Sequence, residues 1–228
     1  MISKKKYQRL PLSTLLIYAL YQTIFPFFII YGLLIALKRS LKEPSHLKRL
    51  SDRFGLGPIG EKGAIWIYAA SLGEMNAARP LVQVFLDNGH YILLTHLSPA
   101  GLQAGQKFFG NNPKVTHRYM PLDFFLLVRL FLLRARPSCG IVLEIETWPA
   151  MLVEADKLKL PMYLANGNLV ALALKRLESW KRHSLYMYRL FNHIFTRSEE
   201  YVDRYRGTGV QLQDLTVIGD LKLENPRN

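Results

Sequence analysis

The chain has 228 residues, half of them hydrophobic, which suffices for one well-packed domain with an added membrane segment but makes two full domains a tight fit. Thirty Lys and Arg against seventeen Asp and Glu give a net charge of +13, which favours anionic partners: nucleic acid, phospholipid headgroups or a phosphorylated substrate. The single cysteine, Cys139, excludes an internal disulfide framework and, within its apolar run, predicts a buried, unreactive thiol in a reducing compartment.

The first predicted element is an uncharged apolar stretch from Leu10 to Leu37, longer than the ~20 residues that span a bilayer core. It is too long for a secretory signal and lacks a small-residue cleavage site, so residues 1–37 are expected to be a retained membrane anchor. Pro11 and Pro26 leave open whether it spans the bilayer as a membrane helix or lies kinked and partly embedded in one leaflet. Polar residues also interrupt the stretch: Ser13, Thr14, Gln22 and Thr23.

Basic residues flank the anchor, four before it and six within residues 38–53. The larger count after the anchor favours the cytoplasmic side for the following domain. A helix that enters only one leaflet would let both flanks contact the same anionic membrane surface. Residues 38–63 are charged and contain "GLGPIGEKG", which predicts a basic linker to a globular domain at 64–228.

From residue 64, short apolar runs alternate with helix-length segments. Strands are predicted near residues 64–70, 91–96, 115–120, 139–145, 161–165, 193–197 and 215–218. Helices are predicted at residues 74–88, 99–109, 123–134, 148–159, 171–191 and 198–207. This order predicts an α/β fold, a Rossmann-like parallel sheet with helices on both faces. Ligands of such sheets bind beyond the carboxyl ends of the strands, where the helices begin.

The first junction, "AASLGEMN", allows two interpretations of Glu74. Ser71 and Glu74 have the spacing of a capping box, which would make the glutamate a structural helix cap. Alternatively, Gly73 lets another molecule approach closely, and Glu74 projects into the cleft as a general base. Ser98 and Pro99, at the second junction, have the spacing of an N-cap followed by Pro at the first helical position.

The fourth junction, "LEIETWP", holds two more carboxylates at the end of a strand expected to be buried. Glu144 and Glu146 are two residues apart and would share one face of an extended chain. Two like charges there are costly unless they are hydrogen-bonded or functional. The alternative is a strand that runs out into solvent before a helix begins at Trp148 and Pro149.

Five blocks together resemble a known family. The blocks "AASLGEMNAARPLV", "LEIETWP", "LANGNL", "SEEYVDRYRGTGV" and "VIGDLKLE" are similar, in order and spacing, to the N-terminal half of the bacterial Kdo transferases. Those enzymes add 3-deoxy-D-manno-octulosonic acid (Kdo) to the lipid A precursor. The resemblance implies the N-terminal half of a GT-B glycosyltransferase, anchored at the cytoplasmic face of the inner membrane, with CMP-Kdo as donor substrate and no cofactor.

The resemblance also implies roles for individual residues. Glu74 matches the proposed general base, which deprotonates the acceptor hydroxyl as it attacks the anomeric carbon with inversion, and Ser71 and Gly73 belong to the same substrate-binding block. The family's two acidic positions at the cleft floor correspond to Glu144 and Glu146. The remaining match is Lys222, which could pair with the carboxylate or phosphate of the donor.

The sequence departs from the family pattern in three places. Ile145 and Thr147 reverse the usual polar and apolar order of the acidic block. Asn168 and Val170 replace an arginine and a serine, so these positions do not supply the family's anion contact. The chain ends at Asn228, so the resemblance implies that the C-terminal donor domain lies on another segment or polypeptide.

Basic residues also lie largely off the apolar stripe of the predicted helix 171–191: Lys175, Lys181, Arg182 and Arg189. They form either a solvated face or a surface for the membrane and the phosphates of the lipid. No histidine spacing predicts a metal site, and the absence of Walker, G-x-G-x-x-G and aromatic RNA-binding motifs argues against nucleic acid.

The leading hypothesis is therefore a Kdo transferase of lipopolysaccharide biosynthesis, represented by its acceptor-binding half, with the phosphorylated lipid A precursor as partner. The alternative is a non-catalytic, membrane-anchored module that binds the lipid acceptor or pairs with a separate donor domain. A third reading, another GT-B sugar transferase, is disfavoured by the E-x-E-x-W-P block.

Overall fold

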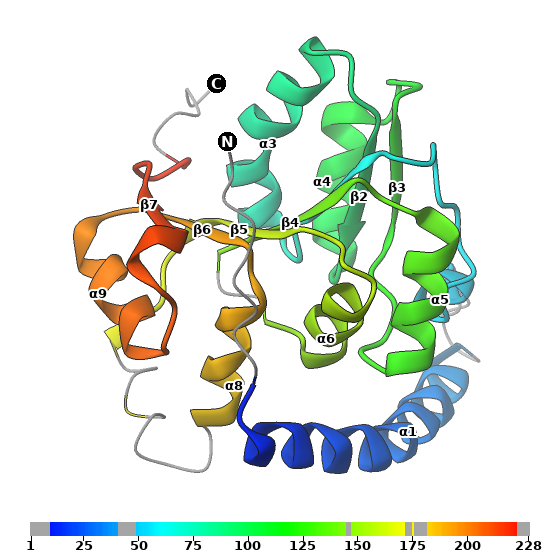
Figure 1. Ribbon diagram of the computed structural model, residues 1–228. Helices are drawn as coiled ribbons and strands as arrows, with labels where there is room; N and C mark the ends of the chain where they lie inside the picture. Colours follow the sequence, from blue (N-terminus) through cyan, green and yellow to red (C-terminus); the bar gives the residue numbers. More distant parts are fainter. Residues whose placement is uncertain (1–9, 41–48, 145–146, 172–174, 176–181, 223–228) are drawn as a thin grey trace.

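The computed structural model describes residues 10–40, 49–144, 147–171, 175 and 182–222 (Figure 1). Seven parallel strands form one sheet in the order β3-β2-β1-β4-β5-β6-β7. The strands are β1 (Ile65–Tyr68), β2 (Ile92–His96), β3 (Val115–Tyr119), β4 (Cys139–Leu143), β5 (Met162–Gly167), β6 (His193–Thr196) and β7 (Leu215–Val217). All seven predicted strands are thus confirmed.

The described helices follow the predicted pattern closely. The α-helices are α1 (Leu12–Ser40), α2 (Leu50–Arg53), α3 (Leu72–Asp87), α4 (Pro99–Phe109), α5 (Phe125–Ala135), α6 (Pro149–Lys157), α8 (Arg182–Tyr186) and α9 (Glu199–Gly207). Two short 3-10 helices are η3 (Met187–Leu190) and η4 (Leu212–Asp214). The predicted Rossmann-like fold is confirmed.

The helices cover the two faces of the sheet unequally. In Figure 1, α3 and α4 lie on one face, over β1, β2 and β3, whereas α5, α6, α8 and α9 lie on the other. The strand order reverses between β1 and β4, which makes their carboxyl ends the topological switch point where such sheets bind ligands. Over β4 to β6, the α3 face carries an apolar pocket of about 460 Å³, lined in part by Phe85, Ile141, Tyr163 and Leu221.

The core consists of two apolar clusters, one on each face of the sheet. On the α5 face, Trp66 of β1 is fully buried and packs edge-on against Phe131 of α5, with 5.2 Å between ring centroids. Its indole N–H donates to the hydroxyl of Thr95 at 2.8 Å, so no polar atom of the ring is left without a partner. On the α3 face, Ile67 and Met75 are fully buried. Both faces of β1 are therefore covered, as its continuous apolar run predicts.

The predicted helix at 171–191 is described only in part. Leu185 and Tyr188, which the apolar stripe placed in the core, are buried. The residues of the predicted basic face do not all point into solvent, because Arg189 donates to the carbonyl oxygen of Thr208 at 2.9 Å. Arg182 is exposed, and Lys181 lies outside the described residues. Arg189 therefore belongs to the packing of the domain rather than to a solvated surface.

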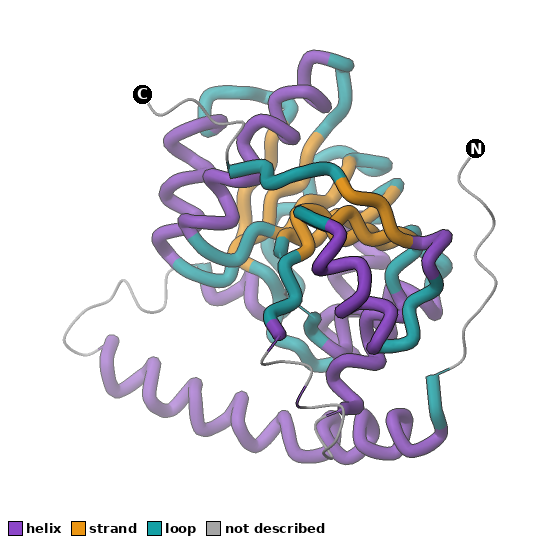
Figure 2. The backbone as a smooth tube through the Cα atoms, turned by 90° about the vertical axis from the view of Figure 1, so that its left-hand side faces the viewer, coloured by secondary structure: helices purple, strands orange, loops and turns teal. Residues whose placement is uncertain are grey.

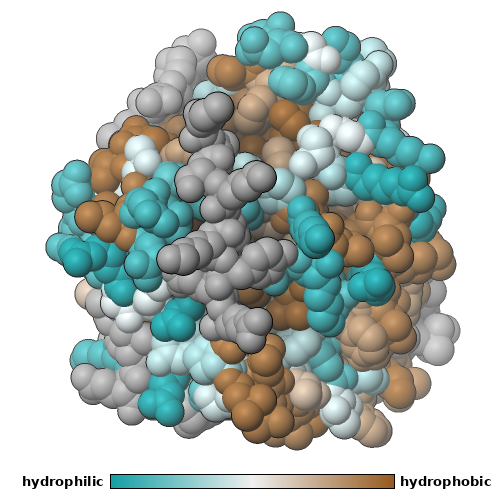
Figure 3. Space-filling model, in the orientation of Figure 1, coloured by the Kyte–Doolittle hydropathy of each residue, from teal (hydrophilic) through white to brown (hydrophobic). Residues whose placement is uncertain are grey.

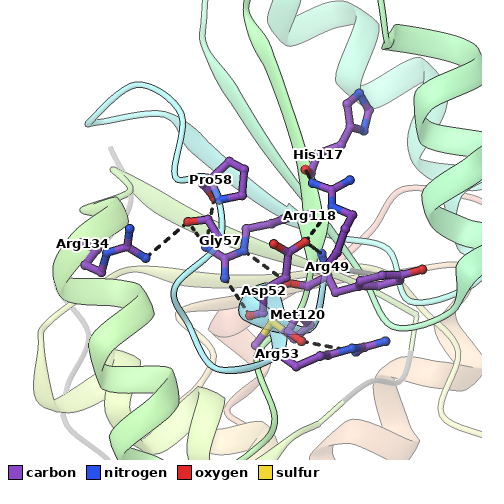
Figure 4. Close-up of polar contacts among 10 residues, drawn as sticks. Arg49, Asp52, Arg53, Gly57, Pro58, His117, Arg118, Met120 and Arg134 are labelled. Carbon is purple, nitrogen blue, oxygen red and sulfur yellow. Dashed lines mark hydrogen bonds and ion pairs between the residues drawn. The ribbon is translucent and has the colours of Figure 1, made fainter. Parts of the chain in front are cut away.

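A buried arginine ties the segment before β1 to the domain (Figure 4). Arg118 of β3 is fully buried and donates to the carbonyl oxygens of Asp52 at 2.8 Å and Pro58 at 3.0 Å. It also donates to the carbonyl oxygen of Gly57 at 3.3 Å. A Cβ atom at Gly57 would lie 2.0 Å from Oδ1 of Asp52, so residue 57 must lack a side chain for this packing.

Parts of the predicted basic linker, residues 38–63, have regular structure or contact the domain. Residues 38–40 belong to α1, and α2 contacts β3 through the hydrogen bond from the backbone N–H of Tyr119 to Asp52 Oδ2, at 3.0 Å. From Arg49 onward the segment thus packs against β3, while the predicted bounds of the linker and of the domain stay a prediction. Residues 41–48 lie outside the described part of the chain.

Two stacked histidines lie beneath α4. His96 of β2 is fully buried, and its Nδ1 lies 3.0 Å from the carbonyl oxygen of Ala69. Its ring stacks on His117 of β3, with 6.1 Å between ring centroids and 13° between the planes. A Cβ atom at Gly105 of α4 would lie 2.8 Å from His96 Nε2. The close approach of the helix to the two rings therefore requires a glycine.

Acid should destabilise the fold through this pair. Burial lowers the pKa of His96 to about 4 and also lowers that of His117, so stability is lost as pH falls from 6.5 toward 4. His96 alone should account for a loss of roughly 3 kcal/mol between pH 7 and pH 4. His96→Asn, whose amide can still donate to Ala69, should flatten this dependence in urea unfolding at each pH. An identical pH dependence in both proteins would contradict this prediction.

Candidate functional site

The carboxyl end of β1 carries the predicted capping box. Ser71 is the N-cap of α3, and its hydroxyl accepts a hydrogen bond from the backbone N–H of Glu74 at 3.3 Å. In return, Oε2 of Glu74 accepts from the backbone N–H of Ser71 at 2.9 Å. Glu74 is 7% exposed. The structural interpretation of this spacing is thus confirmed, and the carboxylate is held at the first turn of the helix.

The surface around this cap is open. Ser71, Leu72 and Gly73 are exposed, and a Cβ atom at Gly73 would meet only the Ser71 hydroxyl, at 3.9 Å. A ligand can therefore approach the backbone of the first turn. A carboxylate accepts up to about four hydrogen bonds, and the capping box uses one of them. Capping and contact with a substrate hydroxyl are chemically compatible at this position.

The carboxyl end of the neighbouring strand, β4, holds Glu144 in an unusual conformation. Its φ is +64°, a left-handed backbone that costs a non-glycine residue about 1 kcal/mol or more, and such strain is concentrated at functional sites. The chain is therefore not extended through Glu144, contrary to the sequence-based expectation. Glu146 and Ile145 lie outside the described residues. Whether the two glutamates share a face stays a prediction.

Glu144 binds two cations that come from distant parts of the sequence. Its Oε1 lies 2.5 Å from Nζ of Lys222 and 3.0 Å from a guanidinium nitrogen of Arg197. Arg197 also pairs with Asp220 at 3.4 Å. The amide of Asn168 donates to the other oxygen of Glu144 at 3.4 Å. These five residues, which we call the strand-end cluster, contain two carboxylates, two cations and one amide.

The strand-end cluster forms because the chain turns back after β7. Arg197 follows β6 directly, whereas Asp220 and Lys222 come from the segment after β7. The backbone N–H of Leu221 donates to Oδ1 of the buried Asn166 in β5, at 3.1 Å, which holds that segment across the strand ends. Asn166 has a φ of +59° at a register shift between β5 and β6. The bulge therefore places an amide where the returning chain needs an acceptor.

The structure brings together some of the predicted site residues. Glu144 and Lys222 are in direct contact, and Ser71, Gly73 and Glu74 adjoin one another at the end of the adjacent strand β1. Sequence reasoning missed Arg197, although it is the last residue of a predicted strand, and strand ends were the criterion that identified the other junctions. Asn168 stands at the position where the family has an arginine. Arg197 contacts the same carboxylate, that of Glu144, and so supplies a cation beside this position.

Three further sequence-based expectations concern the cap at Ser98, the cysteine and metal binding. The hydroxyl of Ser98 accepts from the backbone N–H of Gly101 at 3.1 Å, which confirms it as the N-cap of α4. Cys139 is half-buried rather than fully buried as predicted, and burial raises the pKa of its thiol, which disfavours the reactive thiolate. Within the described part of the chain, no group of three or more His, Cys, Asp or Glu residues could hold a metal ion.

Sequence comparison identifies relatives with one shared description. The transferase from Bordetella pertussis, described as "3-deoxy-D-manno-octulosonic acid transferase", is 37% identical over 139 residues, which cover 60% of this chain and 32% of the relative. The protein of the same description from Haemophilus influenzae is 30% identical over 190 residues, covering 81% of this chain and 44% of the relative. The chain thus spans less than half the length of these relatives.

Structural comparison identifies enzymes with a similar Rossmann-like fold. The UDP-GlcNAc 2-epimerase from Neisseria meningitidis aligns with a TM-score of 0.54 at 13% identity, over 71% of this chain and 48% of that chain. The enzyme of that name from Methanocaldococcus jannaschii aligns with a TM-score of 0.53 at 15% identity, over 71% of this chain and 48% of that one. At such identities the comparison supports the fold alone.

The family assignment is independent of these individual relatives. The sequence family described as "3-Deoxy-D-manno-octulosonic-acid transferase (kdotransferase)" matches residues 48–225. These residues include every strand of the sheet, the capping box at Glu74 and the strand-end cluster. The chain therefore belongs to the Kdo transferase family, of which it carries the N-terminal domain.

Proposed function

We propose that this chain is the acceptor-binding half, residues 64–228, of a Kdo transferase that acts in lipopolysaccharide biosynthesis. The observation that carries the proposal is the pair of polar groups at adjacent strand ends, Glu74 after β1 and the strand-end cluster around Glu144 after β4. Both lie at the switch point of the sheet, where ligands of this fold bind. The donor is CMP-Kdo, and the acceptor is a phosphorylated lipid A precursor. No cofactor is needed for this chemistry.

In the proposed reaction, an acceptor hydroxyl attacks the anomeric carbon of Kdo while the bond from that carbon to the CMP phosphate breaks. CMP leaves with the bonding electrons, and Glu74 takes the proton of the hydroxyl. Attack opposite the leaving group inverts the configuration of the anomeric carbon. The open first turn beside Ser71 and Gly73 gives the sugar access to Glu74. General-base catalysis requires this hydrogen-bond reach before any other property.

The strand-end cluster is proposed to bind an anionic group of the substrates. Lys222 is 42% exposed, so an incoming carboxylate or phosphate can reach its ammonium group in exchange for Glu144. Arg197 is more deeply buried, with its side chain 16% exposed, and its two ion pairs hold the cluster together. Glu146 joins this site in the proposal through its place in the acidic block.

The proposal includes a place in the cell. The apolar residues Leu12–Tyr31 of α1 form a helix long and apolar enough to cross a membrane. The excess of basic residues after this helix supports a location at the inner membrane, with the globular domain on the cytoplasmic face. A lipid acceptor and an anionic membrane surface fit the net charge of +13. The donor-binding half is a separate C-terminal domain, on the same or another polypeptide.

One turnover assay tests this function. Purified chain is given CMP-Kdo and the tetraacylated lipid A precursor, with and without a supplied C-terminal domain from a relative, and the lipid product is measured. Product in the mixture with both halves is the expected result. No product in either mixture, together with retained binding of the lipid, would favour the alternative of a non-catalytic acceptor-binding module. Transfer of a different sugar would contradict the assignment of the donor.

A further inference from the structure

The apolar helix α1 lies along the base of the domain instead of projecting away from it. Both Figure 1 and Figure 2 show it beneath the helices of the α5 face. Most of its large apolar side chains point outward, and Leu16, Phe27 and Phe28 are 63%, 70% and 64% exposed. A core helix of a water-soluble protein would bury these side chains. This outward surface therefore needs an apolar partner.

Three polar residues of α1 bind the domain. Gln22 donates to the carbonyl oxygen of Asp123 at 3.1 Å and accepts from the backbone N–H of Phe125 at 2.8 Å. The hydroxyl of Tyr21 donates to the carboxylate of Asp123 at 3.2 Å. Thr14 is fully buried, and its hydroxyl lies 2.9 Å from Nδ1 of His183 in α8. Two of the polar residues that interrupt the apolar stretch, Thr14 and Gln22, are thus docking contacts.

Asp123 makes this contact part of the domain itself. Its carboxylate accepts from the backbone N–H groups of Ala150 and Met151 at 3.0 and 2.9 Å, and so caps the first turn of α6. It is 4% exposed, and burial raises its pKa to about 6. Removing α1 would leave a buried carboxylate and two backbone groups at Asp123 and Phe125 with fewer partners. The docked helix therefore completes a buried hydrogen-bond network.

The chain also returns to the same domain after α1. Arg49 pairs with Asp52 at 3.0 Å, and Asp52 accepts from the backbone of β3, as described above. Contacts with one folded domain therefore lie both near the start of α1 and soon after its end. A single span would require these two groups of contacts to lie on opposite sides of the bilayer.

Helix length leads to the same conclusion. With residues up to Gln22 held against the domain, the uncharged remainder of α1 is the 15 residues from Thr23 to Leu37. At 1.5 Å per residue these cover about 22 Å, less than the ~30 Å of a bilayer core. Pro26 interrupts this remainder. The part of α1 beyond its docking contacts is thus too short to cross the membrane.

We propose that α1 is a monotopic membrane helix, which lies in one leaflet with both of its ends on the side of the folded domain. This inference rests on the membrane location proposed above but not on the sugar chemistry. The outward surface of α1 contacts acyl chains, and Figure 3 shows hydrophobic surface at the base and beside it, over α1 and α5. Leu126 and Leu133 of α5 extend the apolar surface, at 54% and 48% exposed.

The charge of the chain selects a lipid surface as the partner. The exposed Arg182 adjoins His183, the docking partner of Thr14, and basic residues flank both ends of the helix in the sequence. Cations at the rim of an apolar helix face suit a leaflet with anionic headgroups. An apolar surface of a second protein would leave these charges without partners. The domain would therefore sit directly on the membrane, held there by its own docked helix.

Cysteine labelling in bacterial spheroplasts tests the topology. Cys139→Ser gives a cysteine-free background, into which Ser3→Cys, before α1, or Asn111→Cys, in an exposed loop of the domain, is introduced. A membrane-impermeant maleimide should label neither position in intact spheroplasts and both after lysis, with the chain in the membrane fraction. Labelling of Ser3→Cys alone in intact spheroplasts would overturn the proposal. Absence of the chain from the membrane fraction would also overturn it, while leaving the turnover assay as a separate test.

Hydrogen exchange in anionic liposomes tests whether the docking contacts persist on the membrane. The backbone N–H of Phe125 donates to Gln22, so its exchange should be slow in the wild type and much faster in Gln22→Leu. Thr23→Leu is the matched control, because the Thr23 hydroxyl donates only within α1, to the carbonyl oxygen of Ala19. Equal, fast exchange at Phe125 in the wild type and in Gln22→Leu would mean that α1 leaves the domain, and would overturn the proposal.

Discussion

Glu74→Gln should lower kcat by about 100- to 10,000-fold in the turnover assay with the supplied C-terminal domain, while the free energy of unfolding changes by less than about 1 kcal/mol. Glutamine keeps an acceptor oxygen for the backbone N–H of Ser71, so the capping box survives. It cannot take a proton from the acceptor hydroxyl. The substitution thus separates the two interpretations of Glu74. The measurements are turnover of CMP-Kdo and urea unfolding of the same protein.

Ser98→Ala is the matched control for this experiment. It removes the N-cap of α4, the neighbouring helix, without touching the proposed base. We expect it to cost about 1 kcal/mol of stability and to leave turnover unchanged. Wild-type turnover in Glu74→Gln would leave Glu74 as a helix cap only. The general base would then have to be sought among the other polar groups at the strand ends.

Arg118→Met should destabilise the domain by about 3 to 5 kcal/mol, since it removes the shared donor of three carbonyl oxygens in the segment before β1. Burial lowers the pKa of Arg118 to about 10, so its guanidinium is still charged at neutral pH. Methionine retains most of the apolar stem but loses the contact with the ring of Phe131, which lies 4.8 Å from the guanidinium carbon.

Urea unfolding of the detergent-solubilised chain, followed by tryptophan fluorescence, measures this loss. Arg206→Met is the control, because Arg206 is 55% exposed and pairs with the exposed Asp203 in its own helix. We expect that variant to lie within about 0.5 kcal/mol of the wild type. Equal stability of the two variants would contradict the assigned role of the buried guanidinium.

Much of the fold could be predicted because parallel strands are buried on both faces. The central strands then appear as short runs rich in apolar residues, as "IWIY" and "CGIVL" do, and the segments between strands have helical length. The helix starts at Ser71 and Ser98 were predictable for a related reason. A cap depends on residues three apart in the chain, so the sequence contains both partners of the contact.

The membrane segment shows where such local reasoning stops. Its apolar length predicted contact with lipid, but its polar residues looked like interruptions of a spanning helix. Gln22 and Thr14 are hydrogen-bonded in the folded chain, because the fold places Asp123 and His183, more than 100 residues away, beside them. Hydropathy reports how apolar a helix is, but not which of its polar residues will meet a partner.

The sequence by itself determined the strands, most helix boundaries, the capping box at Glu74 and, through five ordered blocks, the Kdo transferase family. Only the tertiary structure decided that Glu144 meets Arg197 and Lys222, that Arg118 holds the segment before β1, and that α1 docks on the domain. The physical reason is the range of the interactions. Caps and strand burial act over a few residues, whereas these contacts depend on the order of strands in the sheet and on the path of the chain after β7.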